Sequence, residues 1–333
     1  MSNNFTGKYG PLLIAEIGGN HEGNFEYAKK LTQLAIDTKV DFVKFQIYTG
    51  DTLVSKEESP DRNKHFKKFE LTREQHIELA SMVTEAGINY TSSVWDLEAL
   101  KWIDEYIPIY KIGSGDLTAY PVLEVIAKIG KPIVISTGLA TEEEVLDSIN
   151  FIQSVNNVYK DADMLAILQC TSMYPINFSD ANLAVMKRLK SLTGMTIGYS
   201  DHTEGSKALI YAAAMGAEVL EFHFTDSREG KEFRDHKVSL TPQEVTDLIS
   251  ELKEIEILSG NEFKRPLDIE ISNGHVKSFR RGVYAKININ KGDTFESSNL
   301  TVLRPNEGMD AREFSALLGK KAPRDYKVHQ KIN

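Results

Sequence analysis

The sequence predicts a (β/α)8 TIM barrel followed by a small β-rich domain. Eight short apolar runs rich in β-branched residues recur along the chain, and helical patterns lie between them. Near-continuous apolar strands that alternate with helices are typical of a parallel sheet covered on its outer side. Eight such units match a (β/α)8 barrel in number and size, with a doubly wound open sheet as the alternative. The pattern changes after residue 262, where the barrel domain (1–262) is expected to end.

The expected strands and helices follow from local signals. The eight apolar runs are residues 12–18, 42–46, 89–94, 109–114, 132–137, 165–171, 195–201 and 219–224. Three helix starts carry a threonine with Gln or Glu three positions later, which favours a capping box: Thr72 with Gln75, Thr141 with Glu144 and Thr241 with Glu244. After the last of these, apolar residues recur at helical spacing: Val245, Leu248, Ile249, Leu252 and Ile255. This helix therefore has one face that can pack on a sheet.

The end of the chain has a different organisation. Residues 263–274 carry Pro266 and Gly274 and are expected to form a linker. Residues 275–333 show short alternating segments punctuated by glycine and proline, which indicates a small β-rich domain. A domain of roughly 60 residues has a marginal core of its own. We therefore expect it to pack on a neighbour.

Composition and charge exclude several classes of function. The net charge of −9 gives no reason to expect nucleic acid or an anionic membrane as a partner. No apolar run approaches the ~20 residues of a membrane span, and the N-terminus lacks a signal-peptide pattern, so a cytoplasmic location is expected. Cys170 is the only cysteine, which excludes an intramolecular disulfide and a cysteine-based zinc cage. We expect its side chain to be a small buried hydrophobe.

Charged residues interrupt three of the expected strands. Glu16, Lys44 and Lys111 each lie in an apolar run, and a buried charge is costly unless it is paired or binds a ligand. An internal salt bridge between Glu16 and a lysine is one explanation. The second explanation is a site for phosphate or carboxylate, since hydroxyl groups stand at the ends of neighbouring strands: Ser93, Ser114, Ser136 and Ser200.

Two histidines stand at the ends of adjacent expected strands. Glu221, His223 and Thr225 share one strand face, and His202 ends the preceding strand. Adjacent strands lie about 4.8 Å apart, so both imidazoles can reach one point. Two imidazoles without a thiolate suit Mn²⁺, or Mg²⁺, completed by water or substrate oxygens. The alternative is that each histidine is a hydrogen-bonded core residue.

Two further segments follow expected strands. Tyr174 lies just after the sixth strand and is a candidate wall of the pocket. Asp235 precedes the last helix of the barrel and is a candidate for binding a polyol hydroxyl. Its neighbour His236 is expected to be solvated.

At these residues the sequence resembles the sialic acid synthase family. The motifs stand in the family's order over nearly the whole chain: IAEIGGNHEGN, DFVKFQ, YTSSVWD, YKIGSGDLT, VISTGLAT, CTSMYP, IGYSDHT and LEFHFTD. The segment after residue 279 is similar to the family's C-terminal antifreeze-like (SAF, β-clip) domain, which itself resembles type III antifreeze proteins. The resemblance implies condensation of phosphoenolpyruvate with an N-acylated hexosamine and water, by C–O cleavage, to a nine-carbon sugar acid and phosphate.

The resemblance also implies roles for particular residues. Phosphoenolpyruvate would be held by Lys44, Ser93, Lys111, Ser114, Ser136 and Ser200. His202 and His223 would bind a divalent metal, Mn²⁺ or else Mg²⁺ or Co²⁺, with Glu16 near the reacting carbons and Glu221 beside the substrate. Tyr174 and Asp235 would contact the sugar. Arg281 would reach the site from the partner subunit of a domain-swapped homodimer.

Departures from the family's motifs lie on the sugar side. Ser172 stands where some members have an asparagine that touches the sugar, and Asp235 lacks the frequent Gly-Pro before it. The acceptor could therefore be N-acetylmannosamine or a diacetamido-trideoxyhexose that leads to legionaminate or pseudaminate. A phosphorylated sugar would require a basic cluster beyond Lys44 and Lys111, which the sequence does not place. Two rival functions are a Schiff-base aldolase, with Lys44 or Lys111 as its amine, and a non-catalytic sugar-binding module.

Overall fold

The computed structural model describes residues 3–333 and divides the chain into two compact units. The first unit ends at Gly260 and the second comprises Asn261–Asn333. None of the helices formed by residues 3–333 is long and apolar enough to cross a membrane.

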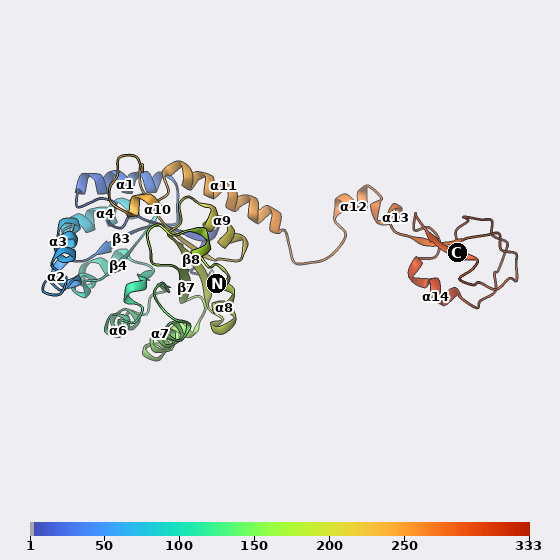
Figure 1. The fold of residues 1–333 in the computed structure, drawn as a ribbon, viewed down its shortest axis with the longest axis horizontal. Coiled ribbons are helices and arrows are strands. Elements are labelled where there is room, and N and C mark those ends of the chain that lie inside the picture. Colours follow the sequence, from blue (N-terminus) through green and yellow to red (C-terminus); the bar gives the residue numbers. More distant parts are fainter. Residues whose placement is uncertain (1–2) are drawn as a thin grey trace. The chain divides into compact units, whose positions relative to one another are not determined.

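The first unit is a nearly closed barrel whose strands coincide with the predicted apolar runs (Figure 1). Its parallel strands are β2 (Gly10–Glu16), β3 (Phe42–Ile47), β4 (Asn89–Val94), β5 (Tyr110–Ile112), β6 (Ile133–Ser136), β7 (Leu165–Cys170), β8 (Thr196–Asp201) and β9 (Val219–His223). An unpredicted short strand, β1 (Thr6–Gly7), pairs antiparallel with β2. The first and last barrel strands, β2 and β9, pair in parallel, so the doubly wound alternative is wrong.

The barrel has one seam without a strand ladder. The pairing order runs β4-β3-β2-β9-β8-β7-β6-β5, which leaves β4 and β5 at its two ends. These strands contact each other, and the Thr91 hydroxyl donates a hydrogen bond of 2.6 Å to the Ile109 carbonyl across the seam. The side chain thus joins the edges that the backbone leaves unpaired.

Helices surround the strands (Figure 1). The long ones are α1 (Phe25–Asp37), α4 (Arg73–Glu85), α6 (Tyr120–Ile129), α7 (Glu142–Val155), α8 (Ala184–Thr193), α9 (Lys207–Ala214) and α11 (Pro242–Ser259). Shorter pieces are α5 (Leu100–Ile103), α10 (Asp235–Val238) and the turns η1 (Leu97–Ala99), η2 (Asp104–Tyr106), η3 (Ser114–Asp116), η4 (Asn157–Lys160) and η5 (Phe178–Asp180). The three predicted capping boxes are confirmed at Thr72, Thr141 and Thr241.

One part of the barrel was not predicted. Between β3 and α4 the chain forms α2 (Gly50–Leu53) and α3 (Pro60–Phe69) before the barrel pattern resumes. We call residues 48–72 the α2–α3 segment. Long connections in compact domains are commonly functional, and this one follows the carboxyl end of a barrel strand.

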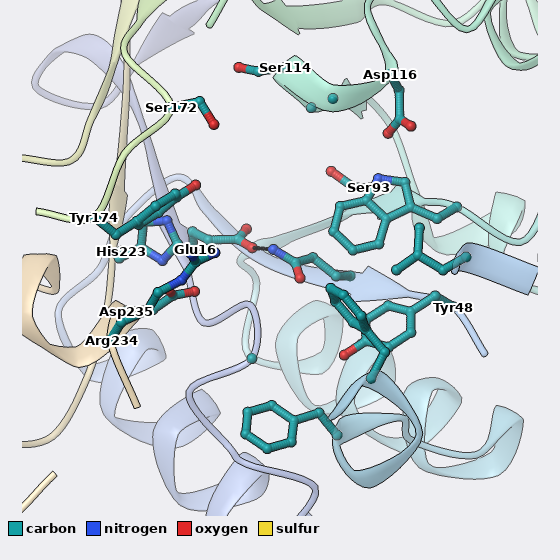
Figure 2. A pocket seen from close by; sticks show the side chains of 18 of the residues that line it. Glu16, Tyr48, Ser93, Ser114, Asp116, Ser172, Tyr174, His223, Arg234 and Asp235 are labelled. Carbon is teal, nitrogen blue, oxygen red and sulfur yellow. Dashed lines mark hydrogen bonds and ion pairs between the residues drawn. The ribbon is translucent and has the colours of Figure 1, made fainter. Parts of the chain in front are cut away.

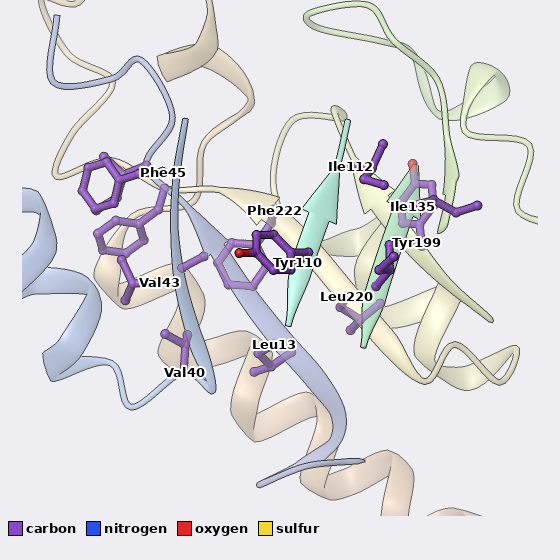
Figure 3. Close-up of a cluster of buried hydrophobic side chains, with 14 of the residues drawn as sticks. Leu13, Val40, Val43, Phe45, Tyr110, Ile112, Ile135, Tyr199, Leu220 and Phe222 are labelled. Carbon is purple, nitrogen blue, oxygen red and sulfur yellow. The ribbon is translucent and has the colours of Figure 1, made fainter. Parts of the chain in front are cut away.

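Strand parity separates the core into two parts. Alternate residues face outward and pack against the helices, as Leu13, Val43 and Leu220 do in Figure 3. The inward-facing residues form a small apolar cluster that includes Leu12, Ile14 and Phe42. The inward rows continue toward the strands' carboxyl ends with the polar candidate site residues, because residues two apart share a face. The apolar cluster is therefore the floor on which the polar site rests.

The second unit contains, in its described residues, one two-stranded antiparallel sheet. β10 (Gly282–Ala285) pairs with β11 (Leu300–Leu303), and four isolated bridges add further strand-like contacts. Helices α12 (Asp268–Ser272), α13 (His275–Ser278) and α14 (Phe314–Leu317) complete it, with η6 (Ala311–Glu313), around a small core of its own. The sequence predicts a β-rich domain here, and the described residues show this one sheet and these four bridges as its β-structure. The antifreeze-like character of the unit and the linker boundaries at 263 and 274 stay predictions.

Candidate active site

A cavity of about 1200 Å³ opens at the carboxyl ends of the barrel strands (Figure 2). The candidate site residues of the first unit all line it: Glu16, Lys44, Ser93, Lys111, Ser114, Ser136, Ser172, Tyr174, Ser200, His202, Glu221, His223 and Asp235. Arg281 belongs to the second unit, where its exposed guanidinium donates to the Val302 carbonyl at 3.2 Å. The structure therefore brings together residues that are far apart in the sequence.

Four buried charges form the centre of this site. Lys44 Nζ contacts Glu16 Oε2 and lies 3.3 Å from Glu221 Oε1. Lys111 Nζ lies 3.3 Å from Glu221 Oε2 and donates to the Ser136 hydroxyl at 2.7 Å. Each of the four side chains is at most 6% exposed. We call Glu16, Lys44, Glu221 and Lys111 the charge quartet, and it includes the predicted salt bridge between Glu16 and a lysine.

Burial and pairing set the protonation of the quartet in different ways. Burial raises the pKa of Glu16 to about 7, although Lys44 opposes this. Burial alone would also raise the pKa of Glu221, but Lys111 and Lys44 together hold it well below its usual range. Burial lowers the pKa of Lys111, whereas Glu16 and Glu221 overcome burial and raise the pKa of Lys44. Glu221 is thus the permanent anion, and Glu16 is the group poised to exchange a proton near neutral pH.

Hydroxyl groups lie around the lysines. Ser136 already accepts from Lys111, and Ser114 Oγ accepts from the Gly138 backbone N–H at 3.0 Å. Cys170 lies among them, and burial raises the pKa of its thiol to about 11, in keeping with the inert role expected of it. Hydroxyl and ammonium donors in one cavity are suited to an anion such as phosphate or carboxylate.

The two histidines converge as predicted. The ring centroids of His202 and His223 lie 5.3 Å apart, and Tyr174 packs against both rings at 4.0 and 5.4 Å. Burial lowers the pKa of both imidazoles, that of His223 further because His202 is close. Both rings are therefore neutral near pH 7 and keep a lone pair for a ligand.

The surroundings of these rings fit a divalent metal. His202 Nδ1 lies 2.7 Å from the Thr171 carbonyl, so this nitrogen carries the proton and leaves Nε2 free, as is usual for metal-binding histidines. His223 Nδ1 is buried and has no hydrogen-bond partner among residues 3–333. The same residues contain no group of three or more His, Cys, Asp or Glu side chains arranged to hold a metal. The protein would thus supply two ligands, with the rest from water or substrate.

Asp235 is held beside the histidines by an unpredicted network. Asp235 is 7% exposed, and its neighbour His236 is only 1% exposed, so the expectation that His236 is solvated is wrong. His236 Nδ1 lies 2.7 Å from the Thr225 hydroxyl, and Nε2 lies 3.2 Å from Glu22 Oε1. This buried ring joins the loop after β2 and the residues after β9 to α10, which carries Asp235 at its first position.

Sequence reasoning missed the outer wall of the cavity. Several lining residues come from the α2–α3 segment, and Trp95 and Phe233 add aromatic surface: the segment contributes Tyr48, Leu53, Val54, Ser55, Arg62, His65, Phe66, Lys68 and Phe69. Residues 60–69 carry a signal that could have revealed this wall. A proline at the start of a helix, followed by aromatic and basic residues at helical spacing, predicts an extra helix between the second strand and the next barrel helix.

Comparison with known proteins identifies the family. A model of the NeuB family matches residues 31–264. The chain belongs to the NeuB family. Members of the family and their structures resemble it over most of their length. The N,N'-diacetyllegionaminic acid synthase of Campylobacter jejuni is 35% identical over 96% of this chain and 98% of that protein.

Two further similarities are to proteins of Mus musculus and Leptospira borgpetersenii. The N-acetylneuraminate-9-phosphate synthase of Mus musculus is 32% identical over 95% of this NeuB-family chain and 89% of that protein. The crystal structure of an N-acetylneuraminic acid (sialic acid) synthetase from Leptospira borgpetersenii, in complex with citrate, matches with a TM-score of 0.72. It is 28% identical and covers 79% of this chain and 90% of that chain. The resemblance inferred from the motifs is thus confirmed at the level of the family.

The raised pKa of Glu16 predicts a pH dependence of stability. The folded protein holds this proton more tightly than the unfolded chain, whose carboxyl has the ordinary value of 4.5. The stabilisation is therefore complete below pH 4.5 and is lost as the pH rises to about 7. We expect urea unfolding to show a free energy that falls across this window in the wild type and less steeply in Glu16→Gln. The exposed Glu143→Gln is the control. Equal slopes in wild type and Glu16→Gln would contradict the shift.

Proposed function

We propose that this protein is a nonulosonic acid synthase that condenses phosphoenolpyruvate with the open-chain form of an N-acylated hexosamine. C3 of phosphoenolpyruvate forms a bond to the aldehyde carbon, and the aldehyde oxygen takes up a proton to become a hydroxyl. Water adds at C2, and the C2–O bond to phosphate breaks. The products are a nine-carbon sialic-acid-type acid and inorganic phosphate.

The observation that carries the proposal is the pair of buried lysines deep in a hydroxyl-lined cavity. Phosphoenolpyruvate presents a phosphate and a carboxylate, and Lys44 and Lys111 lie in one cavity with Ser93, Ser136 and Ser200. Glu16 and Glu221 neutralise the lysines before the substrate arrives. Fixed donors of this kind favour an anion without reorganising during the reaction.

The two histidines suit the role of metal ligands in this reaction. His202 and His223 would hold Mn²⁺, or Mg²⁺ or Co²⁺, which as a Lewis acid would polarise the acceptor's aldehyde. Side chains of the protein orient the substrates and transfer the proton. Lys44 and Lys111 orient phosphoenolpyruvate toward the acceptor. Glu16, whose pKa burial raises to about 7, accepts the proton of the water that adds at C2.

The acceptor would lie on the side of Tyr174 and Asp235. Tyr174 packs on the imidazoles, and Asp235 faces the same cavity, where Ser172 also lies (Figure 2). A carboxylate is a strong acceptor for sugar hydroxyls. We propose that Arg281 completes this side from the partner subunit of a domain-swapped homodimer.

The rival functions have weaker support. A Schiff-base aldolase needs a lysine with a free amine. Glu16 and Glu221 raise the pKa of Lys44, which speaks against Lys44 in this role. Burial lowers the pKa of Lys111, so Lys111 is the amine that this rival would use. Borohydride trapping with a keto acid would reveal such an amine. A non-catalytic sugar-binding module has no need of the charge quartet beside two neutral imidazoles. Within the proposed reaction, legionaminate, pseudaminate and N-acetylneuraminate remain the candidate products.

Phosphate release tests the proposal directly. We expect phosphoenolpyruvate and Mn²⁺ to give inorganic phosphate with N-acetylmannosamine, its 6-phosphate or a diacetamido-trideoxyhexose, and EDTA to stop this release. His202→Ala and His223→Ala should each lower the rate more than ~100-fold, since they remove proposed ligands of the metal. His275→Ala, at an exposed position of α13, is the control. Full release in EDTA, or from either variant, would refute the metal assignment, and no release with any acceptor would refute the reaction.

Arg281 offers a test of the proposed partner contribution. Arg281→Gln should raise the KM for the sugar ~10-fold through the loss of a charge-assisted hydrogen bond, and should spare the KM for phosphoenolpyruvate. The adjacent and also exposed Arg280→Gln is the matched control. An unchanged sugar KM in Arg281→Gln would remove Arg281 from the site.

A further inference from the structure

The α2–α3 segment turns one face of a helix toward the cavity. Arg62, His65, Phe66 and Phe69 recur on α3 at intervals of three and four, so they share a face. All four line the cavity, together with Lys68. Phe233, which precedes α10, packs against this face. Its ring centroid lies 4.9 Å from that of Phe69 and 5.9 Å from that of His65.

Arg62 and Lys68, the two α3 cations that line the cavity, have no partner of opposite charge among residues 3–333. Arg62 lies over the Phe66 ring at 5.9 Å, and Lys68 lies over the Phe69 ring at 5.8 Å. Neither forms an ion pair with any carboxylate of residues 3–333. In a protein of net charge −9, two uncompensated cations in one cavity are an informative exception.

A third cation comes to the same place from the segment before α10. Arg234 lies over the Tyr174 ring at 4.8 Å and contacts Asp235 at 3.3 Å (Figure 2). After burial, the charges of Arg234, Lys68 and Arg62 are what lower the pKa of His65, so all three lie near its ring. We call Arg62, His65, Lys68 and Arg234 the outer cationic cluster.

The outer cationic cluster differs from the charge quartet in its balance. In the charge quartet, Glu16 and Glu221 form ion pairs with Lys44 and Lys111. In the outer part, Asp235 pairs with Arg234 at 3.3 Å, Glu22 contacts His236 at 3.2 Å, and the exposed Glu232 also lines the cavity. Arg62 and Lys68, which form no ion pair with residues 3–333, therefore keep donors to spare for an anionic ligand.

We propose that the outer cationic cluster binds a phosphate monoester carried by the acceptor sugar. This inference rests on the proposed function and names its substrate class. Two arginine forks, an ammonium and an imidazole can together satisfy the several oxygens of a phosphate dianion. The floor already offers two lysines for phosphoenolpyruvate, and a cavity of about 1200 Å³ has room for a second anionic group at its outer end. This is the basic cluster that the sequence alone could not place, because its members come from α3 and from the segment before α10.

Direct binding tests the cluster without depending on turnover. Isothermal titration calorimetry would compare N-acetylmannosamine with its 6-phosphate on the full-length protein. The wild type should bind the phosphate tighter, and the double variant Arg62→Gln/Lys68→Gln should raise the Kd of the phosphate ~10-fold or more while the Kd of the neutral sugar stays the same. The matched control is Lys56→Gln/Lys64→Gln, which removes two exposed charges of the same segment that do not line the cavity.

The outcomes separate this inference from the proposed function. Equal affinities for the two sugars in the wild type, or an unchanged Kd of the phosphate in Arg62→Gln/Lys68→Gln, would overturn the inference. If Arg62→Gln/Lys68→Gln weakened only the binding of phosphoenolpyruvate, the inference would also be overturned, because these cations would then bind the other substrate. If the phosphate binds through the cluster but no acceptor supports phosphate release, the cluster stands and the proposed reaction fails.

Discussion

The ion pairs among Glu16, Lys44, Glu221 and Lys111 are the constraint on which the site depends. Removing one member of a buried ion pair leaves an uncompensated charge that costs about 3–5 kcal/mol. The quartet avoids this because two lysines and two carboxylates share contacts and because Ser136 and Gln46 satisfy further polar atoms. Well-packed apolar residues at these four positions would stabilise the fold equally well. We infer that the quartet exists because it presents paired ammonium groups to an anion.

The barrel makes this arrangement possible through strand register. Glu16 is level with Lys44 on one side and with His223 on the other, and Ser200 is level with Glu221. Inward positions on neighbouring parallel strands thus meet at the same height above the apolar floor. A one-residue shift of any one of these strands would turn its member of the quartet outward among the helices, away from its partners. The chemistry and the hydrophobic pattern of the strands therefore specify the same register.

The sequence was sufficient wherever a local signal and the fold agree. The β-branched runs predicted every barrel strand, threonine caps predicted three helix starts, and charges inside strands predicted the floor of the site. It was insufficient where a residue's environment comes from distant segments. His236 is buried because Thr225 and Glu22 both reach its ring. Arg62 and Arg234 share a cavity only through the fold. In the second unit, weak alternation overstated the amount of regular sheet.

The most direct test of the account is the affinity of phosphoenolpyruvate for Lys111→Met, measured by isothermal titration calorimetry. Lys128→Met, at an exposed position of α6, is the matched control, and far-UV circular dichroism would verify that both variants are folded. Because a charge-assisted hydrogen bond contributes about 1.5–3 kcal/mol, the account predicts that the Kd rises ~10- to 100-fold in Lys111→Met alone. A folded Lys111→Met protein that binds phosphoenolpyruvate as tightly as the wild type would contradict the claim that the quartet exists to hold this anion.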